Sequence, residues 1–493
     1  MAMVNLRFFR VMIKQFKRGI YMLFSSNIFI FVFLPLVLLF YYTILRKHRS
    51  LQNTFLFLVS LVFYAWGEPT FVLVMLLSIV VNWIFGLLVE RNREREKLMK
   101  TIVGVDVVFN LVIIFIFKYL MFVMENVKAL FHIEGMNIPE IALPIGISFF
   151  TFQAMSYVID VYRGDGKAQK NPINVGLYIA LFPQLIAGPI VRYQTVAEEI
   201  DNRKENFDDF SSGVVRFIIG LGKKVILANN MAIVADYAFS TAGSNSIALA
   251  WLGVTAYGFQ ILFDFSGYSD MAIGLGRMFG FHFLENFDYP FISISITEFW
   301  RRWHISLGTW FRDYVYIPLG GNRSKTAARR IFNIFAVWFL TGLWHGANWT
   351  YIVWGLMYFV LLIFEKYSPF DVADKKKKHH FIKHIYVIFF TWMAWVIFRA
   401  DSLTEAVKYF GDMFGHAQLI DDGFLEYFRQ YAVYIVICIF ASTPILKKFQ
   451  IKFKTEQSVL WSSLGMLALI AMFLVAVSFI VKNTYNPFIY FNF

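Results

Sequence analysis

The sequence predicts an all-α membrane protein whose helices cross the bilayer many times. Of its 493 residues, 58% are hydrophobic and 16% are charged, and the mean hydropathy is +0.57, whereas soluble domains are typically about half apolar and about a quarter charged. Long apolar stretches such as Ile28–Leu45 and Gln457–Val481 match the roughly 20 residues that cross a bilayer core. A water-soluble enzyme and a disordered chain are excluded, and so is a porin-like β-barrel, because strands of alternating apolar and polar residues are absent.

The membrane helices are expected where apolar stretches lie between charged residues or turns. Gly67–Glu68–Pro69 marks a tight turn between two of them. Gly188–Pro189 interrupts the stretch 174–190, which we expect not to cross, since broken backbone is tolerated in a membrane when it is buried in protein. The length rule gives about 11 to 13 crossings in all, among them 28–45, 51–66, 71–89, 101–124, 144–161, 213–231, 249–264, a pair between 331 and 364, 384–398, 431–446 and 457–481.

Basic clusters set the expected orientation of these helices. Lysines and arginines gather in 91–100, 366–383 and 447–455, and cytoplasmic loops carry such an excess. The same rule accounts for the formal net charge of +13 without nucleic acid as a partner. Both termini then lie outside.

The first 21 residues break this rule, because they place five basic residues on the expected exterior. They form either an amphipathic helix on the membrane surface or an extension upstream of a start at Met22. We therefore assign 22–493 to one transmembrane domain, with a catalytic core at about 140–365.

The residues between 257 and 355 differ from the rest because polar and ionisable side chains interrupt the apolar sequence. Such residues are costly in a membrane and mark function, and His304 and His345 lie among them. His345 is about 14 residues into its span, or roughly 21 Å deep at 1.5 Å per residue. The small neighbours Gly342 and Gly346 let another backbone or a substrate approach closely.

A buried, neutral imidazole suits the role of a general base that takes a proton from a hydroxyl. The alternative is a structural histidine that binds a neighbouring helix. The single cysteine, Cys438, lies in a plain apolar run, and no G-x-S-x-G motif occurs. Acidic residues at metal-ligand spacing to the histidines are also missing, which argues against a zinc hydrolase.

Long sequence blocks surround the two histidines. They read R-R-W-H-I-S-L-G-T-W-F-R-D-Y-V-Y-I-P-L-G-G from Arg301 and L-W-H-G-A-N-W from Leu343, and further blocks begin at Met22, Phe182, Phe263 and Phe398. In these blocks the chain resembles the membrane-bound O-acyltransferase (MBOAT) family, from Met22 to the C-terminal N-P-F-I-Y-F-N-F. Within that family it is most similar to the bacterial branch typified by the alginate O-acetylase membrane subunit.

The resemblance implies a ring of tilted helices, with re-entrant and amphipathic cytoplasmic helices, around a thin central region. It implies that His345 is the catalytic histidine and that His304 matches the second histidine of the family, on the cytoplasmic side of the reaction. It further implies a thioester donor, acetyl-CoA or an acyl-carrier thioester, with no covalently bound cofactor and no metal. In this branch, found in the bacterial inner membrane, acetyl is moved outward to a polysaccharide or peptidoglycan, and an SGNH-hydrolase-like partner is implied to complete the transfer.

Other side chains of the segment have two interpretations. Basic residues can bind donor phosphates, because guanidinium forks match phosphate oxygens, or they can face lipid head groups: Arg277, Arg301, Arg302, Arg312 and Lys325. Asp264 and Asp270 bracket a glycine-containing turn at the end of a span, where we expect them to pair with these arginines. We assign both aspartates, together with Trp344, Asn348 and Trp349, to the substrate channel.

Two other functions are weighed against polymer O-acetylation. One is D-alanyl transfer to teichoic acid from a carrier-protein thioester, which the long sequence beyond His345 fits less well. The other is a transporter or flippase that exports a lipid-linked glycan. A transporter of that kind uses internal repeats and intramembrane charges along a pathway, and the sequence has neither feature.

The orientation is tested by cysteine labelling of intact cells. Lys376→Cys places a thiol in the four-lysine run at 375–378, which the positive-inside rule puts in the cytoplasm. A membrane-impermeant maleimide added outside should not label it beyond the level given by the native Cys438 alone. Strong labelling would overturn the orientation.

Overall fold

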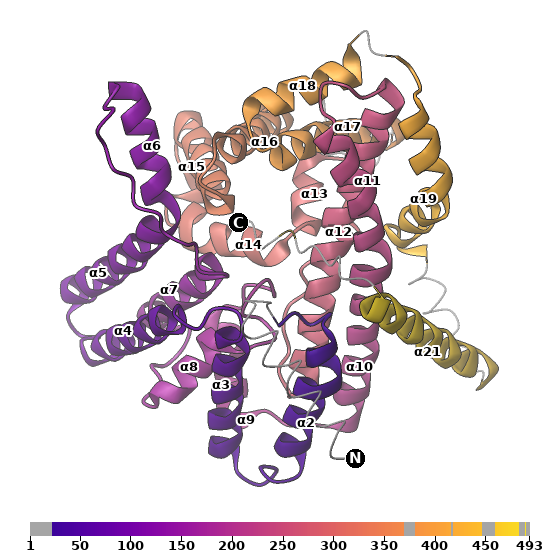
Figure 1. Cartoon of the computed structure of the whole chain (residues 1–493). Helices are drawn as coiled ribbons and strands as arrows, with labels where there is room; N and C mark the ends of the chain where they lie inside the picture. Colours follow the sequence, from indigo (N-terminus) through magenta and orange to yellow (C-terminus); the bar gives the residue numbers. More distant parts are fainter. Residues whose placement is uncertain (1–21, 369–379, 416–417, 446–458, 483–488, 490–493) are drawn as a thin grey trace. The chain divides into compact units, whose positions relative to one another are not determined.

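Helices form every regular element of the computed structural model in the ranges that it describes, which are residues 22–368, 380–415, 418–445, 459–482 and 489 (Figure 1). Eight helical stretches in these ranges are long and apolar enough to cross a membrane. The all-α polytopic fold is therefore confirmed. The eight stretches are Val72–Arg91, Glu96–Phe131, Phe207–Ser240, Ile247–Met278, Trp349–Tyr367, His380–Arg399, Asp422–Ala441 and Ser462–Lys482.

The other expected spans are shorter or less apolar than these eight. The first apolar helix covers only Phe29–Tyr42, which is about 21 Å at 1.5 Å per residue. Helix α8 has nine residues, Pro172–Ala180, so it is too short to cross, as expected for the interrupted stretch 174–190. The extension 1–21 lies outside the described residues, as do 369–379 and 446–458 within the predicted inside loops.

The chain divides into two compact units. The first contains the residues up to Phe217 and Met271–Leu284, and the second contains Ile218–Asp270 and the residues from Glu285 onward. Two long helices, α10 (Phe207–Gly222) and α12 (Ile247–Met278), contribute residues to both units. The assignment of 22–493 to one domain with a core at 140–365 stays a prediction.

In the first unit, polar side chains join apolar helices. The amides of Asn82 on α4 and Asn110 on α5 donate to each other's oxygens at 3.3 and 3.0 Å, and Gly86 of α4 lets the ring of Tyr157 on α7 approach. Hydrogen bonds of this kind hold helices together where lipid gives no hydrophobic driving force. The unit contains η1 (Phe29–Phe33), α2 (Leu34–Tyr42), α3 (Arg49–Ala65), α4 (Val72–Arg91), α5 (Glu96–Ile114), η2 (Phe115–Tyr119), α6 (Leu120–Phe131), α7 (Ile147–Arg163), α8 and α9 (Tyr193–Asn202).

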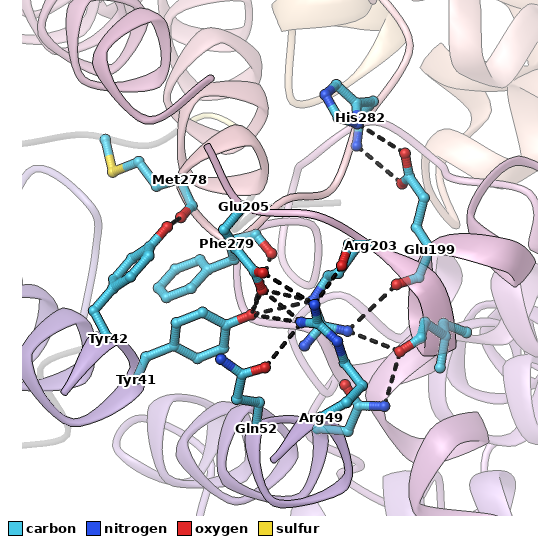
Figure 2. A network of polar contacts seen from close by, with 12 residues as sticks. Tyr41, Tyr42, Arg49, Gln52, Glu199, Arg203, Glu205, Met278, Phe279 and His282 are labelled. Carbon is cyan, nitrogen blue, oxygen red and sulfur yellow. Dashed lines mark hydrogen bonds and ion pairs between the residues drawn. The ribbon is translucent and has the colours of Figure 1, made fainter. Parts of the chain in front are cut away.

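A polar network in the same unit ties the loop after α9 to helices α2 and α3 (Figure 2). Arg203, whose side chain is fully buried, donates from Nε to the Tyr41 hydroxyl at 3.1 Å, and its guanidinium lies 4.5 Å from the centroid of the Phe281 ring. Glu205 accepts from Arg49 at 2.5 Å and also from Tyr41. Burial disfavours the Glu205 carboxylate, but the hydrogen bonds from Arg49 and Tyr41 outweigh it and hold its pKa below the usual value.

In the second unit, α12 is one continuous helix, and this corrects the turn expected between Asp264 and Asp270. Gly267 lies within the helix, and a Cβ there would be 2.7 Å from the carbonyl oxygen of Gly220 on α10, so the glycine serves close helix packing and not a turn. Both aspartates pair with lysines, where the sequence suggested arginines. Lys224 of the π-helical turn η3 (Lys223–Ala228) lies 2.7 Å from Asp264, and Lys223 lies 2.7 Å from Asp270.

The remaining helices of the second unit include α14, which begins directly after His304, and α15, which ends at His345. Short helices follow α12 in the segment 285–323, and longer helices continue from residue 327. Helix α11 (Asn229–Ser240) precedes α12. The helices that follow α12 are η4 (Pro290–Ile292), α13 (Ile296–Arg302), α14 (Ile305–Phe311), η5 (Arg312–Tyr316), η6 (Gly321–Arg323), α15 (Ala327–His345), α16 (Trp349–Tyr367), α17 (His380–Arg399), α18 (Leu403–Phe414), α19 (Asp422–Ala441) and α21 (Val459–Lys482).

The charge of Glu205 should be important for the stability of the first unit. Glu205→Gln leaves the buried Arg203 without its nearby anion, and breaking a buried ion pair costs about 3 kcal/mol. We expect a lower midpoint of thermal unfolding in detergent at pH 7. Because the folded-state pKa of Glu205 is lowered, its contribution is present at neutral pH and is lost as the pH falls through that value.

The matched control is Glu96→Gln, which removes an exposed carboxylate paired with Lys100 at 2.6 Å. Exposed pairs contribute little to stability, so this midpoint should not change. Equal midpoints for the two variants would contradict the role given to Glu205.

Candidate active site

His304 lies at the start of α14 with a backbone conformation that few side chains adopt. Its φ is +46° and its ψ is +52°, in the left-handed region that is uncommon for residues other than glycine. The imidazole is buried, its Nδ1 lies 3.3 Å from Oδ1 of Asn286, and Phe265 packs edge-on at 4.6 Å between ring centroids. His304 lies outside the membrane-spanning helices, and burial lowers its pKa to about 3, so the ring is neutral at physiological pH.

His345 is the last residue of α15, directly before the turn into α16. The side chain is buried, and aromatic rings surround it at centroid distances of 4.9 Å for Trp354, 5.0 Å for Trp344 and 5.1 Å for Phe398. These apolar neighbours keep bulk water from the imidazole. The depth estimated from the sequence assumed that the helix continues past His345. In the structure His345 lies at the end of the helix and not in the middle of a span.

The glycines near His345 bring α15 and α16 together. A Cβ on Gly342 would lie 2.6 Å from the carbonyl oxygen of Tyr351, and Gly346 faces the ring of the same tyrosine. The space that these small residues leave is therefore filled by the backbone and side chain of α16. The sequence allowed close approach of either another backbone or a substrate at these glycines, and in the structure it is the backbone of α16 that approaches.

Trp344 connects the two histidines. Its indole meets the ring of His304 at a centroid distance of 5.9 Å and the ring of His345 at 5.0 Å, in both cases edge to face. The structure thus brings together two histidines that are 41 residues apart in the sequence.

A cavity of about 390 Å³ opens beside His304, which is within the usual size range of small-molecule sites. It extends to Thr341 on α15, one helical turn before His345. Its lining is mainly apolar, with two guanidinium groups: Thr297, Trp300, Arg301, His304, Ile305, Leu307, Gly308, Thr309, Phe311, Arg312, Val337, Trp338, Thr341 and Leu362. A cavity with an apolar wall, two cations and a neutral histidine can hold an elongated, partly apolar anion.

Comparison with known proteins assigns the family. A family model described as the membrane-bound O-acyltransferase family matches residues 168–403. The chain is 39% identical to the probable alginate O-acetylase AlgI of Pseudomonas putida, over 96% of this chain and 100% of that protein. The chain belongs to the MBOAT family.

Two further relatives have names that state different activities. The peptidoglycan O-acetyltransferase of Helicobacter pylori is 32% identical over 96% of this chain and 98% of its own length. The teichoic acid D-alanyltransferase of Bacillus subtilis is 33% identical, but over only 48% of this chain and 61% of its own length. As a member of the MBOAT family, the chain is a multi-pass membrane acyltransferase.

The predicted arginines of this MBOAT chain separate into three groups. Arg301 and Arg312 line the cavity with His304, and Arg301 has no ion pair within the described ranges, whereas Arg312 pairs with Asp313 at 2.7 Å. Arg302 is held by Asp288 at 2.9 Å and Glu298 at 3.0 Å and lines a neighbouring cavity. Arg277 belongs to the first unit, where it lies 3.5 Å from the Ser212 hydroxyl, and Lys325 is exposed between η6 and α15.

The residues predicted for the channel have mainly structural contacts. Asn348 is the N-cap of α16: its Oδ1 accepts from the Thr350 N–H at 3.1 Å and its amide donates to the Asp401 carbonyl at 3.0 Å. Trp349 is half exposed, and the two aspartates are engaged by lysines. Of the channel residues, Trp344 contacts both histidines, and the assignment of all five residues to a channel stays a prediction.

Sequence reasoning did not find Asn286, which contacts His304 from the loop between α12 and α13. It lies 18 residues before the histidine, outside the quoted sequence blocks and without a spacing that links the two. Only the folded loop brings them together.

Proposed function

We propose that this MBOAT chain transfers acetyl from a cytoplasmic thioester, acetyl-CoA, to hydroxyl groups of an extracytoplasmic polysaccharide or peptidoglycan. The observation that carries the proposal is the cavity lined by His304, Arg301 and Arg312, which reaches α15 one turn before His345. Residues four apart lie on the same face of a helix, so Thr341 and His345 follow one another along that face. The cavity gives a thioester a path that ends near the second histidine.

The donor part of the proposal depends on the charges at the cavity. The thioester arm of coenzyme A is uncharged and its nucleotide carries phosphates, which matches an apolar wall with guanidinium groups. Arg301 is exposed and has no ion pair within the described ranges, so its donors are available to a phosphate. Arg302 is already engaged by two carboxylates, and we assign it a structural role.

The chemical step uses His345 as a general base. Its neutral imidazole takes the proton of an acceptor hydroxyl as the oxygen attacks the thioester carbonyl. The new C–O bond forms, the C–S bond breaks, and the imidazolium returns the proton to the departing thiolate. The ring thus ends neutral, and general acid–base assistance of this kind contributes about 10²- to 10⁴-fold.

The acceptor and partner follow from the relatives and from the resemblance. Relatives that cover nearly the whole chain are named as an alginate O-acetylase and a peptidoglycan O-acetyltransferase, both from bacteria, which supports a polymer acceptor and a bacterial inner-membrane location. An SGNH-hydrolase-like partner outside the membrane is part of the proposal. The D-alanyltransferase match covers about half of this chain, so D-alanyl transfer is the second candidate.

The proposed function is tested with purified protein, radiolabelled acetyl-CoA and alginate or peptidoglycan fragments, with the partner added in parallel reactions. His345→Ala should lower acetyl transfer by about 10²- to 10⁴-fold, because general-base assistance is lost, while membrane insertion is retained. His304→Ala should impair transfer less completely, through donor positioning. Near wild-type transfer by His345→Ala would make the imidazole structural, and D-alanyl transfer without acetyl transfer would favour the second candidate.

Substitution of Arg301 and of Arg302 should affect donor binding differently. Arg301→Gln should raise the KM for acetyl-CoA by about tenfold or more, since a hydrogen bond to a charged group contributes about 1.5–3 kcal/mol. Arg302→Gln should instead lower thermal stability, because Asp288 and Glu298 lose their cation. Arg323→Gln, an exposed arginine of η6 outside the cavity lining, is the matched control. An unchanged KM for Arg301→Gln would return this residue to the lipid head-group interpretation.

A further inference from the structure

The side-chain amide of Asn286 has an orientation that its neighbours determine. Its Oδ1 lies 3.1 Å from the backbone nitrogen of Ser306 and 2.9 Å from the hydroxyl of the same serine, and its Nδ2 lies 3.0 Å from the hydroxyl of Ser269. A backbone N–H can only donate, so the atom that faces it must be the amide oxygen. If the oxygen and nitrogen of this amide were exchanged, its NH2 group would face the N–H of Ser306, and both groups are donors.

This orientation fixes where the proton of His304 lies. Nδ1 of the imidazole is 3.3 Å from the same Oδ1. A carbonyl oxygen only accepts, and one nitrogen of a neutral imidazole carries the hydrogen while the other carries a lone pair. Nδ1 must therefore be the protonated nitrogen, because a lone pair there would face the oxygen lone pairs. Nε2 is left as an acceptor.

The alternative is that the Ser306 hydroxyl donates to Nδ1. These two atoms are 3.5 Å apart, whereas the hydroxyl oxygen is 2.9 Å from Oδ1 of Asn286. The shorter contact is the stronger hydrogen bond, and it uses the single hydroxyl proton. The serine hydroxyl therefore donates to Oδ1 of Asn286, which also accepts from His304, and not to Nδ1 of the imidazole.

Nε2 of His304 is the atom that this arrangement leaves to a ligand. It is buried and has no hydrogen-bond partner within the described ranges, and His304 lines the cavity. Burying a polar atom without a partner costs free energy, so a group that donates to Nε2 would be bound favourably. The backbone holds this geometry as well, since the N–H of Ile305 donates to the Asn286 carbonyl at 3.0 Å and fixes the left-handed turn at His304.

We propose that Asn286 is a positioning residue that holds His304 in the Nδ1–H tautomer, so that Nε2 accepts a hydrogen bond from an N–H or O–H of the thioester donor. The identity of that donor rests on the proposed function, whereas the tautomer does not. In this state the proton of His304 lies on Nδ1, where Oδ1 of Asn286 accepts it, so Nε2 has none to give to the departing thiolate, and the lowered pKa keeps the ring neutral. The proton therefore moves through His345 alone, and His304 binds.

The tautomer is measured directly by ¹⁵N NMR of histidine-labelled, full-length protein in detergent. The His304 signals are assigned by their loss in His304→Gln. We expect Nδ1 to be protonated and Nε2 to be bare. A protonated Nε2 with a bare Nδ1, or an imidazolium at pH 7, would overturn the proposal whatever the enzyme's activity.

Asn286→Leu tests the link between the amide and the donor. Leucine has a similar size but no acceptor, so the Nδ1–H form should lose its preference in the ¹⁵N spectrum. The KM for acetyl-CoA should rise about tenfold, as expected for one lost hydrogen bond of about 1.4 kcal/mol, while the KM for the acceptor stays constant. Ser293→Ala, which removes a buried hydroxyl from the same loop, should alter neither the His304 signals nor the donor KM.

The two proposals fail in different ways. An unchanged spectrum and donor KM in Asn286→Leu would overturn the positioning role, even if His345→Ala abolishes transfer. Should Asn286→Leu fail to fold, the wild-type spectrum still decides the tautomer. Loss of the proposed function would instead appear as wild-type protein that transfers no acetyl at all.

Discussion

Burial of polar groups in apolar surroundings is the constraint on which both units of this protein depend. A buried polar atom without a partner costs about 1–3 kcal/mol, and more if it is charged, so each one needs a partner within the protein. The first unit meets this cost with the network around Arg203 and with the amide pair of Asn82 and Asn110. The second meets it by pairing each aspartate of α12 with a lysine of η3. Nε2 of His304 is one of several buried polar atoms in the described residues that have no hydrogen-bond partner, and it belongs to a residue of the cavity lining.

Sequence patterns were sufficient for the class of fold, and they singled out the two histidines whose rings both contact Trp344. Apolar stretches of spanning length predict membrane helices because lipid selects for composition and length, and the structure has eight such stretches in the ranges that it describes. His304 and His345 were found because ionisable residues are rare in this setting. The sequence also predicted, from the Gly188–Pro189 interruption, that the stretch 174–190 does not cross, and its helix α8 has only nine residues.

Three-dimensional contacts account for what the sequence did not predict. A glycine in an apolar stretch can mark a turn or a close helix contact, and Gly267 is a contact because α12 continues through it to Met278. Asp264 and Asp270 have lysine partners because η3 lies beside α12, which charge counting along the chain cannot reveal. Asn286 carries no motif, and its value depends on the two hydrogen bonds from Ser306 that orient its amide.

The two histidines differ in ways that suit different tasks. The neutral amide of Asn286 fixes His304 at Nδ1. The residue lines the cavity, and its other ring nitrogen, Nε2, is available for binding. His345 lies at the end of α15, enclosed by Trp344, Trp354 and Phe398. A general base must become positively charged during each turnover, and the neutral amide beside His304 offers no charge that would stabilise an imidazolium. The different surroundings of the two rings fit the proposed division of work between a binding imidazole and a proton-transferring one, and the indole of Trp344 contacts both rings.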